Sequence, residues 1–261
     1  MADSATVLRI DDRGRVRLLT LDRPEQLNAF NDALYDALRD ALVDASRDDS
    51  VAVVILTGAG KAFTAGQDLA ELTDPPRYEE GDGANHGFRP MIKAAATFPK
   101  PLVAAVNGLG VGIGCTILAH CDIVLVADTA RLRAPFVSLG VVPEAASSRL
   151  FPERMGWQAA AELLYTAQWL DADAAVDTGI ARRKVAHERL LVEALDLAHR
   201  IAAMPITSLV ETKKLLLDAR GDLQPLLDRE FDQFLSMVGA PANAEAIAAF
   251  REKRDPDFSR L

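Results

Sequence analysis

Two glycine-rich segments, each placed directly after an apolar run, constrain the fold of this chain more than any other feature. The first covers residues 58–69 (GAGKAFTAGQDL) after the run at 51–57, and the second covers residues 107–116 (NGLGVGIGCT) after the run at 102–106. Such runs predict buried strands, and each segment leads into a predicted helix. Two strand exits of this kind can direct backbone N–H groups to one point. Converging N–H donors stabilise an oxygen that gains negative charge, such as a thioester oxygen when its α-carbon loses a proton.

Each glycine-rich segment taken alone is also typical of a tight strand-to-helix turn in which two backbones pack closely. The first segment lacks the GxxxxGK[S/T] pattern of a Walker phosphate loop. The second has alternating glycines at 108, 110, 112 and 114, which do not form the GxGxxG pattern of a dinucleotide-binding turn. The patterns therefore favour neither of these two nucleotide sites.

The composition is that of an ordinary globular protein, because 49% of the 261 residues are hydrophobic and 26% are charged. A net charge of −9 argues against nucleic acid as the main partner. No apolar run approaches the roughly 18 residues that a membrane span needs. The first residues also lack the basic and apolar regions of a secretory signal. We therefore expect neither a nucleic acid partner nor a membrane partner.

The cysteines and the last residues bear on the location of the protein. Cys115 and Cys121 are the only two cysteines, and they point to different faces of a predicted helix. A disulfide is therefore not expected, and a reduced, cytoplasmic setting fits. The chain ends Ser259-Arg260-Leu261, a conservative variant of the Ser-Lys-Leu peroxisomal address. A chance ending on an exposed tail is the favoured interpretation, and a peroxisomal location stays open.

Periodicity and turn signals predict a β-rich first half and a helical second half. Before residue 135 we expect a hairpin (7–10 and 16–21), a helix capped by Asn31 or Asp32, strands at 51–57, 102–106 and 122–127, and helices at 86–97 and 112–120. Residues 73–87, rich in proline, glycine and acids, predict a loop. Helical patterns dominate from 145 to 250. We expect a core with parallel crossovers over residues 1–204 and a helical extension over residues 205–261.

Further segments surround the glycine-rich turns in a fixed order. They are RPEQLNAFN at 23–31, GKAFTAGQDL at 60–69 and KPLVAAVNG at 100–108, followed by Cys121-Asp122. With them the chain closely resembles the crotonase superfamily, the enoyl-CoA hydratase/isomerase family, from about residue 7 to Phe258. The resemblance implies an α/β fold, a crotonase-type spiral of ββα units with a C-terminal helical trimerisation region. It also implies an acyl-CoA thioester as substrate, no nicotinamide, flavin or metal cofactor, and a homotrimer or a dimer of trimers.

The resemblance places the two oxyanion donors on the backbone N–H groups of Gln67 and Ile113. Many members of the family have glycine where this chain has Ile113. A peptide N–H survives any substitution except proline, so Ile113 keeps the donor and should narrow the floor of the pocket. The positive end of the helix dipole lies near the same oxygen.

The residues that would carry proton transfer differ from those of the family's hydratases. Their two glutamate positions fall on Thr116 and Phe136 here, which argues against hydration by two carboxylates. Glu144 lies after Pro143, where hydratases have glycine. An acid there is also typical of an N-cap or a first helical turn. However, Pro-Glu followed by small residues resembles the peroxisomal-type Δ3,Δ2-enoyl-CoA isomerases, whose glycine segment also carries Gly-Ile and then Thr.

A double-bond shift needs one base. Glu144 would remove a proton from C2 of a 3-enoyl-CoA, and the same group would return it to C4. The apolar neighbours Phe136, Leu139 and Val142 should raise the pKa of the Glu144 carboxyl and strengthen it as a base.

The resemblance also suggests residues that contact CoA. Arg23, Leu27 and Ala29 match the segment that lines the pantetheine and phosphates, and Lys61 is a further phosphate partner. Ala65, Asp68 and Leu69 match the turn that receives the adenine. Phe250, Lys253 and Phe258 would come from the C-terminal helix of a neighbouring subunit. Among the other titratable residues, Glu71 and Asp74 are expected to be solvated, and His120 is expected to be packed and hydrogen-bonded.

Three functions therefore remain open. The favoured one is a Δ3,Δ2-enoyl-CoA isomerase that uses Glu144. The second is an enoyl-CoA hydratase, or another crotonase reaction with a rearranged base. The third is a non-catalytic acyl-CoA-binding protein, which Thr116 and Phe136 support and Glu144 opposes.

Overall fold

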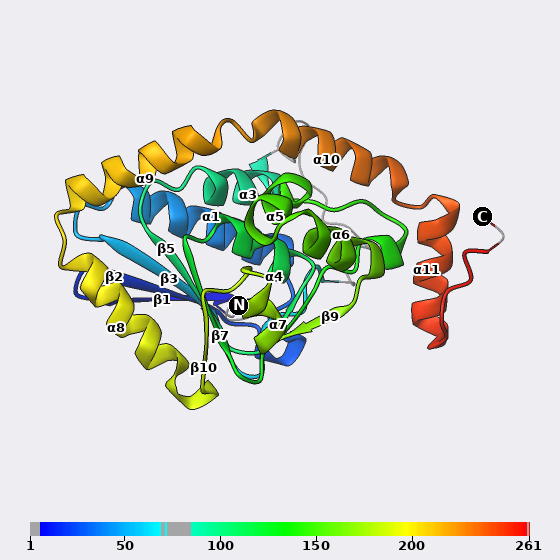
Figure 1. The fold of residues 1–261 in the computed structure, drawn as a ribbon, viewed down its shortest axis with the longest axis horizontal. Helices are drawn as coiled ribbons and strands as arrows, with labels where there is room; N and C mark the ends of the chain where they lie inside the picture. Colours follow the sequence, from blue (N-terminus) through cyan, green and yellow to red (C-terminus); the bar gives the residue numbers. More distant parts are fainter. Residues whose placement is uncertain (1–5, 69–70, 72–84, 260) are drawn as a thin grey trace, which may run out of the picture.

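A computed structural model describes residues 6–68, 71, 85–259 and 261, and shows two sheets surrounded by helices (Figure 1). The larger sheet has six strands in the order β1-β2-β3-β5-β7-β10. Its strands are β1 (Leu8–Arg13), β2 (Val16–Leu21), β3 (Val53–Gly58), β5 (Leu102–Val106), β7 (Ile123–Ala127) and β10 (Arg183–Val185). The smaller sheet has the order β4-β6-β8-β9, with β4 (Ala62–Thr64), β6 (Leu109–Val111), β8 (Arg131–Arg133) and β9 (Trp169–Asp171).

From β3 to β8, consecutive strands alternate between the two sheets. The chain passes from β3 to β4, from β5 to β6 and from β7 to β8, and each pair contributes one strand to each sheet. β2, β3, β5, β7 and β10 pair in parallel, as do β4, β6 and β8, whereas β1 and β9 pair antiparallel at their edges. Each turn of the chain therefore repeats a strand, a second strand and a helix. This is the expected spiral of ββα units.

The helices are arranged around the larger sheet (Figure 1). Helices α1 (Asp32–Arg47) and α3 (Phe88–Ala96) lie on one side of it, and α8 (Leu190–Ala202) packs on β2, β3, β5 and β7. The first five residues of β3 and all of β5 are buried, as their continuous apolar runs predict. The other helices are α4 (Ile113–Thr116), α5 (Ser147–Met155), α6 (Trp157–Thr166), α7 (Ala172–Asp177), α9 (Ile206–Arg220), α10 (Gln224–Met237) and α11 (Pro241–Glu252), with 3-10 turns at η1 (Pro24–Gln26), η3 (Ile117–His120), η4 (Val137–Leu139) and η5 (His187–Arg189).

Most of the predicted elements are confirmed, and two predictions are wrong. The predicted helix at 112–120 is divided into α4 and η3. Arg154 bonds the carbonyl groups of Leu118, Ala119 and Cys121 and so closes the end of this segment. The predicted helical stretch from 145 to 250 is interrupted by β9 and β10, each three residues long. Strands this short carry no readable periodicity, and only pairing with distant strands defines them.

Several polar residues of the segments that resemble the crotonase superfamily hold the strands in place. Lys100 precedes β5, and its side chain is buried against the C-terminus of α1. It donates to the carbonyls of Ala45 and Asp48, both at 2.7 Å. Asp122 accepts from the Leu102 backbone N–H at 2.8 Å. Asn28 and Asn107 each donate to the carbonyl of Ala62. These residues therefore have a structural role in the segments that resemble the family, and their contacts do not include a catalytic group.

The helical extension packs on the core through specific contacts. Lys213 of α9 forms an ion pair with Asp122 at 2.5 Å, and Asn243 of α11 donates to the Leu139 carbonyl at 2.8 Å. α8 ends at Ala202 and α9 begins at Ile206, so the chain turns at the expected position. That residues 205–261 form a separate oligomerisation region remains a prediction.

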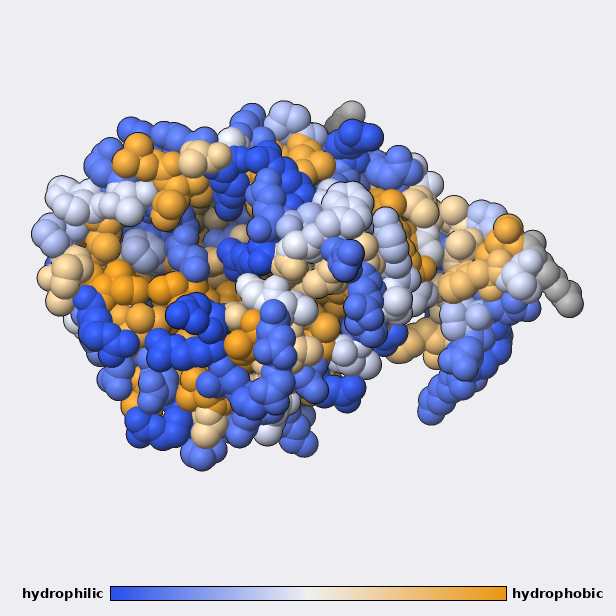
Figure 2. Space-filling view, in the orientation of Figure 1, coloured by the Kyte–Doolittle hydropathy of each residue, from blue (hydrophilic) through white to orange (hydrophobic). Residues whose placement is uncertain are grey.

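Apolar side chains are exposed on α8 and α9. Leu191 and Val192 of α8 and Leu215 and Leu216 of α9 are between 38% and 68% exposed. Figure 2 shows apolar residues gathered on the face between these two helices. Patches of this kind on a folded protein are typical of contact surfaces.

Candidate active site

The two glycine-rich turns meet at the same edge of the smaller sheet. Gln67 follows β4 and Ile113 follows β6, and these two strands are parallel neighbours. Gly66 has φ +96°, and a Cβ at this position would lie 2.9 Å from the Val111 carbonyl oxygen. Only glycine fits such a close approach with this backbone conformation. The expected convergence of the two turns is therefore confirmed.

The backbone N–H groups of Gln67 and Ile113 lie on the two turns that meet. Phe30 donates to the Gly66 carbonyl at 2.7 Å and accepts from the Asp68 N–H at 2.8 Å, which turns the N–H of Gln67 away from Phe30. Ile113 is the first residue of α4, where a helix leaves its N–H groups unpaired. Within the described ranges neither N–H donates to a backbone carbonyl. The pair can serve as an oxyanion hole.

Tyr35 joins the first donor turn to helix α1. Its hydroxyl donates to the side-chain Oε1 of Gln67 at 2.8 Å, and its ring contacts Phe30 and Phe88. Burial raises the pKa of Tyr35 well above its usual range, and the charge of Glu144 adds to this effect. Tyr35 therefore lies within electrostatic reach of the Glu144 carboxyl. Sequence reasoning missed this residue, since one tyrosine among the apolar positions of a helix gives no signal.

Glu144 is partly buried at the start of the turn that leads into α5, and its environment favours the protonated form. Burial, with the negative charge of Glu230 as the second cause, raises the pKa of the Glu144 carboxyl to about 8. The nearby Thr116 hydroxyl, which donates to the Gly112 carbonyl at 3.3 Å, acts in the opposite direction and lowers the pKa of Glu144. Thr116 is fully buried on α4, the helix that begins with Ile113. The carboxyl therefore lies among elements that also carry the oxyanion donors.

The turn that carries Glu144 has an unusual backbone. Ala145 and Ala146 have φ of +61° and +55°, a conformation that residues with a Cβ seldom adopt. His120, expected to be packed and hydrogen-bonded, donates through Nε2 to the Ala145 carbonyl at 2.8 Å. Burial lowers the pKa of His120 to about 4, so the imidazole is neutral near pH 7. The expectation for His120 is confirmed.

The hydratase positions carry no acid. Thr116 and Phe136 are both buried in the core. The expectation that Glu71 is solvated is wrong, since its Oε2 accepts from the Asp32 backbone N–H at 2.8 Å. That bond occupies the first turn of α1, where a carboxylate also complements the helix dipole. Asp74 lies outside the described residues.

The expected CoA-contact segments come together around the first turn. Ala65 donates its N–H to the Leu27 carbonyl at 2.9 Å. Arg23 forms an ion pair with Asp68 at 2.9 Å and also donates to the Ala29 carbonyl. Arg23 thereby ties both predicted segments together. Lys61 is exposed, one residue before β4, and Leu69 lies outside the described residues.

The C-terminal residues of the expected contact set are exposed in this chain. Phe250 is 65% exposed and Phe258 is 37% exposed. Lys253, also exposed, ends α11 in a left-handed conformation. α11 packs against η4 of its own chain, and the exposed residues remain accessible to a neighbouring subunit. Their predicted role in CoA binding stays a prediction.

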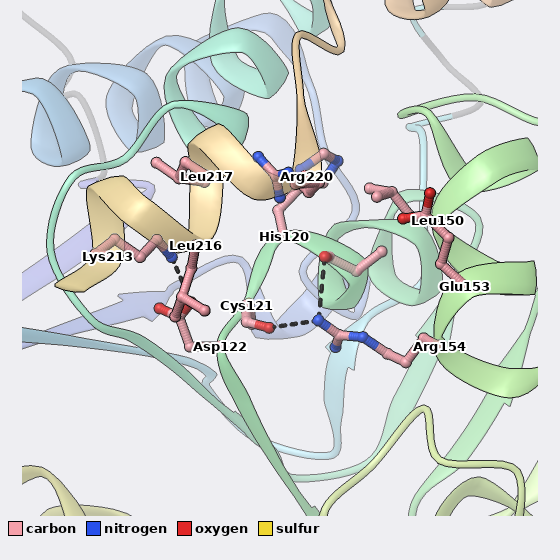
Figure 3. A pocket seen from close by; sticks show the side chains of 11 residues that line it. His120, Cys121, Asp122, Leu150, Glu153, Arg154, Lys213, Leu216, Leu217 and Arg220 are labelled. Atoms are coloured by element: carbon pink, nitrogen blue, oxygen red, sulfur yellow. Dashed lines mark hydrogen bonds and ion pairs between the residues drawn. The ribbon is translucent and has the colours of Figure 1, made fainter.

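A cavity of about 270 Å³ lies behind the Glu144 turn and is drawn in Figure 3. His120, Arg154, Lys213 and Arg220 line it, and none of Gln67, Ile113 and Glu144 does. The charged side chains in its lining have structural roles. Arg154 and Arg220 donate to backbone carbonyls, and Lys213 pairs with Asp122. This cavity contacts the Glu144 turn through His120 and through Leu150, whose N–H donates to the Ala146 carbonyl.

Two further properties concern the described part of the chain. Its residues include no cluster of three or more His, Cys, Asp or Glu side chains with the placement of a metal site. None of its helices combines the length and apolarity that a bilayer span requires.

Comparisons with known proteins agree with this geometry. Residues 11–260 match the sequence profile of the enoyl-CoA hydratase/isomerase family. The chain is 35% identical over 249 residues to 1,2-epoxyphenylacetyl-CoA isomerase of Escherichia coli (strain K12), covering 94% of this chain and 95% of that protein. The chain belongs to the enoyl-CoA hydratase/isomerase family, within the crotonase superfamily, and is an acyl-CoA-processing enzyme.

Solved structures give the same result. An enoyl-CoA hydratase/isomerase from Pseudoalteromonas atlantica T6c superposes with a TM-score of 0.91 at 36% identity, covering 97% of this chain and 99% of that one. Enoyl-CoA hydratase EchA8_6 from Mycobacterium marinum is 52% identical with a TM-score of 0.76, covering 81% of this chain and 99% of that one. The fold is therefore that of the crotonase superfamily.

Proposed function

We propose that this enzyme is a Δ3,Δ2-enoyl-CoA isomerase that moves the double bond of a 3-enoyl-CoA to the 2-trans position. The observation that carries the proposal is the carboxyl of Glu144, whose pKa is raised to about 8 and which lies near Thr116 of α4, the helix that begins with Ile113. A base whose pKa lies near the working pH is suited to moving protons at carbon.

The reaction needs two proton transfers and one site for negative charge. The Glu144 carboxylate removes a proton from C2, and the electrons flow into a dienolate whose oxygen carries the charge. The N–H groups of Gln67 and Ile113 hold that oxygen. The Glu144 carboxylic acid then delivers its proton to C4, so the atoms balance without water. Each oxyanion donor contributes roughly 100- to 1,000-fold to the rate.

The remaining parts of the substrate would bind as the family resemblance suggests. Arg23, Leu27, Ala29 and Lys61 would contact the pantetheine and phosphates, and Ala65, Asp68 and Leu69 the adenine. Phe250, Lys253 and Phe258 would complete this site from a neighbouring subunit. A homotrimer or a dimer of trimers, with the apolar face between α8 and α9 as a contact, would provide that neighbour.

A second function is an enoyl-CoA hydratase, because several relatives carry that name, among them 2,3-dehydroadipyl-CoA hydratase of Escherichia coli (strain K12). Thr116 and Phe136 oppose it, since neither can activate water or protonate carbon. A non-catalytic acyl-CoA-binding protein would keep the donors and need no base.

One assay separates these functions. Purified enzyme is mixed with 3-hexenoyl-CoA and, separately, with trans-2-hexenoyl-CoA, and the absorbance of the α,β-unsaturated thioester is followed. An isomerase raises the absorbance with the first substrate. A hydratase lowers it with the second and leaves the first unchanged, which would overturn the proposal. A flat trace with both substrates, together with binding measured by calorimetry, would identify a binding protein.

A further inference from the structure

We propose that Glu230 of helix α10 is a positioning residue for Glu144, which fixes the turn that carries the base and places a second negative charge beside it. The proposal deepens the isomerase function and rests on Glu144 as its base. It concerns a residue 86 positions away in the sequence, on a helix for which no chemical role was expected.

Glu230 binds the backbone of the turn that follows Glu144. Its Oε2 accepts from the Ala146 N–H at 2.6 Å, and its Oε1 accepts from the Ser148 N–H at 3.1 Å and from the Ser148 hydroxyl. The side chain is only 6% exposed. Glu230 thus caps the N-terminus of α5 from a neighbouring helix, since that end has no cap from its own residues.

The turn needs this support because its backbone is strained. Ala145 and Ala146 both have positive φ, and each non-glycine residue in this region costs about 1 kcal/mol or more. His120 holds the Ala145 carbonyl and Glu230 holds the Ala146 N–H. The two bonds fix the peptides directly after Glu144. The direction of the Glu144 side chain depends on these two distant residues.

The bonds of Glu230 also indicate its charge. All three partners are donors, and a carboxylate, which only accepts, satisfies them all. Burial raises the pKa of the Glu230 carboxyl above its usual value, and these three hydrogen bonds limit the rise without cancelling it. When the two carboxyls compete for one proton, Glu144 is therefore the group that takes it.

Among the residues that the structure describes, three elements present polar groups to Glu144. They are the Thr116 hydroxyl on α4, the Tyr35 hydroxyl on α1 and the Glu230 carboxylate on α10. Tyr35 is neutral, because its pKa is raised well above its usual range. Glu230 is thus the charged neighbour, and its effect on Glu144 is to raise the pKa. Removing that charge should weaken the base.

The first test replaces Glu230 with glutamine, which keeps the size and removes the charge. Glutamate side chains are labelled with ¹³C at Cδ, and the titration of Glu144 is followed by NMR in the whole enzyme, with E144Q providing the assignment. The Glu144 midpoint should fall by roughly one pH unit in E230Q. The acidic limb of kcat/KM should move down by the same amount. Asp232→Asn, an exposed charge on the same helix, should leave both unchanged.

The second test needs no change at Glu230. Because Glu144 keeps its proton at the pH where Glu230 ionises, E144Q, which resembles the protonated Glu144, should leave the Glu230 midpoint unchanged, and in the wild type Glu230 should ionise at a lower pH than Glu144. This measurement holds even if E230Q fails to fold. A Glu230 midpoint that falls in E144Q, an unchanged Glu144 midpoint in E230Q, or lost activity with an unchanged pH profile would overturn the proposal. The NMR readout does not require Glu144 to be catalytic, so failure of the isomerase function would appear separately, in the activity assay.

Discussion

The two halves of the candidate site are built in different ways. The proposed oxyanion donors at Gln67 and Ile113 are backbone groups, positioned by parallel strands and by a glycine contact at Gly66. The proposed base, Glu144, is one side chain on a strained turn, held by His120 and Glu230. The first half tolerates changes of side chain, whereas the second depends on particular residues. A fold of this kind can keep its oxyanion hole and change its reaction through the second half.

Apart from removal of the base itself, the largest effect on catalysis is expected from Gly66→Ala. The new Cβ would lie 2.9 Å from the Val111 carbonyl oxygen, at a residue with φ +96°, so the turn that carries Gln67 must move. Loss of one oxyanion donor lowers the rate by about 100- to 1,000-fold. Steady-state kinetics with 3-hexenoyl-CoA measure the fall in kcat of the Gly66→Ala variant. Gly14→Ala is the matched control, because φ is +66° there and the space is open. It should lower stability and leave kcat unchanged, and equal kcat losses in both variants would contradict the account.

The next effect is a pH-dependent change in the stability of the Glu144→Gln variant. The pKa of Glu144 is raised from 4.5 to about 8, so the folded state binds more protons than the unfolded state between these values. The resulting stability is present below pH 4.5 and is lost as the pH rises through 8. Glu144→Gln should therefore be more stable than the wild type at pH 9, by roughly 1–3 kcal/mol.

Urea unfolding at pH 9 and at pH 6 measures this difference. The gain should be larger at pH 9 than at pH 6. Glu25→Gln, an exposed residue, should show no such dependence. A Glu144 variant that loses stability equally at both values would show that the carboxyl forms favourable contacts in its ionised state.

A smaller effect is expected from Ile113→Ala. The N–H donor remains, so kcat with 3-hexenoyl-CoA should fall by less than about tenfold. The side chain is 2% exposed, and its loss creates a cavity that costs about 2–4 kcal/mol of stability. If Ile113 narrows the floor of the pocket, kcat/KM should shift toward longer acyl chains. A 100-fold loss of kcat would show that the donor depends on this side chain.

The smallest effect is expected from Thr116→Val, which keeps the shape and removes the hydroxyl. The Thr116 hydroxyl holds the pKa of Glu144 down, so this variant should raise it by less than about one unit. The acidic limb of kcat/KM should move up, opposite to the shift expected from E230Q. Shifts in the same direction would contradict the assignment of these two neighbours.

Local patterns in the sequence predicted the first half of the site well. Apolar runs followed by glycine-rich turns define β3 and β5 and the meeting of the turns after β4 and β6. Glycines at positions of close approach leave a visible trace, as Gly66 does. The Asn31 cap of α1, which accepts from the Leu34 N–H at 3.1 Å, was also readable from the sequence.

The second half could be predicted only in part. Glu144 was found because it stands where hydratases have glycine, but its support was not. Tyr35 and Glu230 reach the site from α1 and α10, and nothing near them in the sequence marks that role. Strands β9 and β10 were missed for the same reason, since their pairing partners lie far away in the chain. Long-range contacts therefore account for most of what the sequence did not predict.

The central claim is that one carboxyl moves the proton while two backbone N–H groups hold the oxygen. Glu144→Gln tests it most directly, with kcat measured on 3-hexenoyl-CoA and binding of a saturated acyl-CoA measured by calorimetry. The account predicts a fall in kcat of about 100- to 10,000-fold, the usual range for a general base, with the Kd unchanged. Wild-type activity in this variant would contradict it.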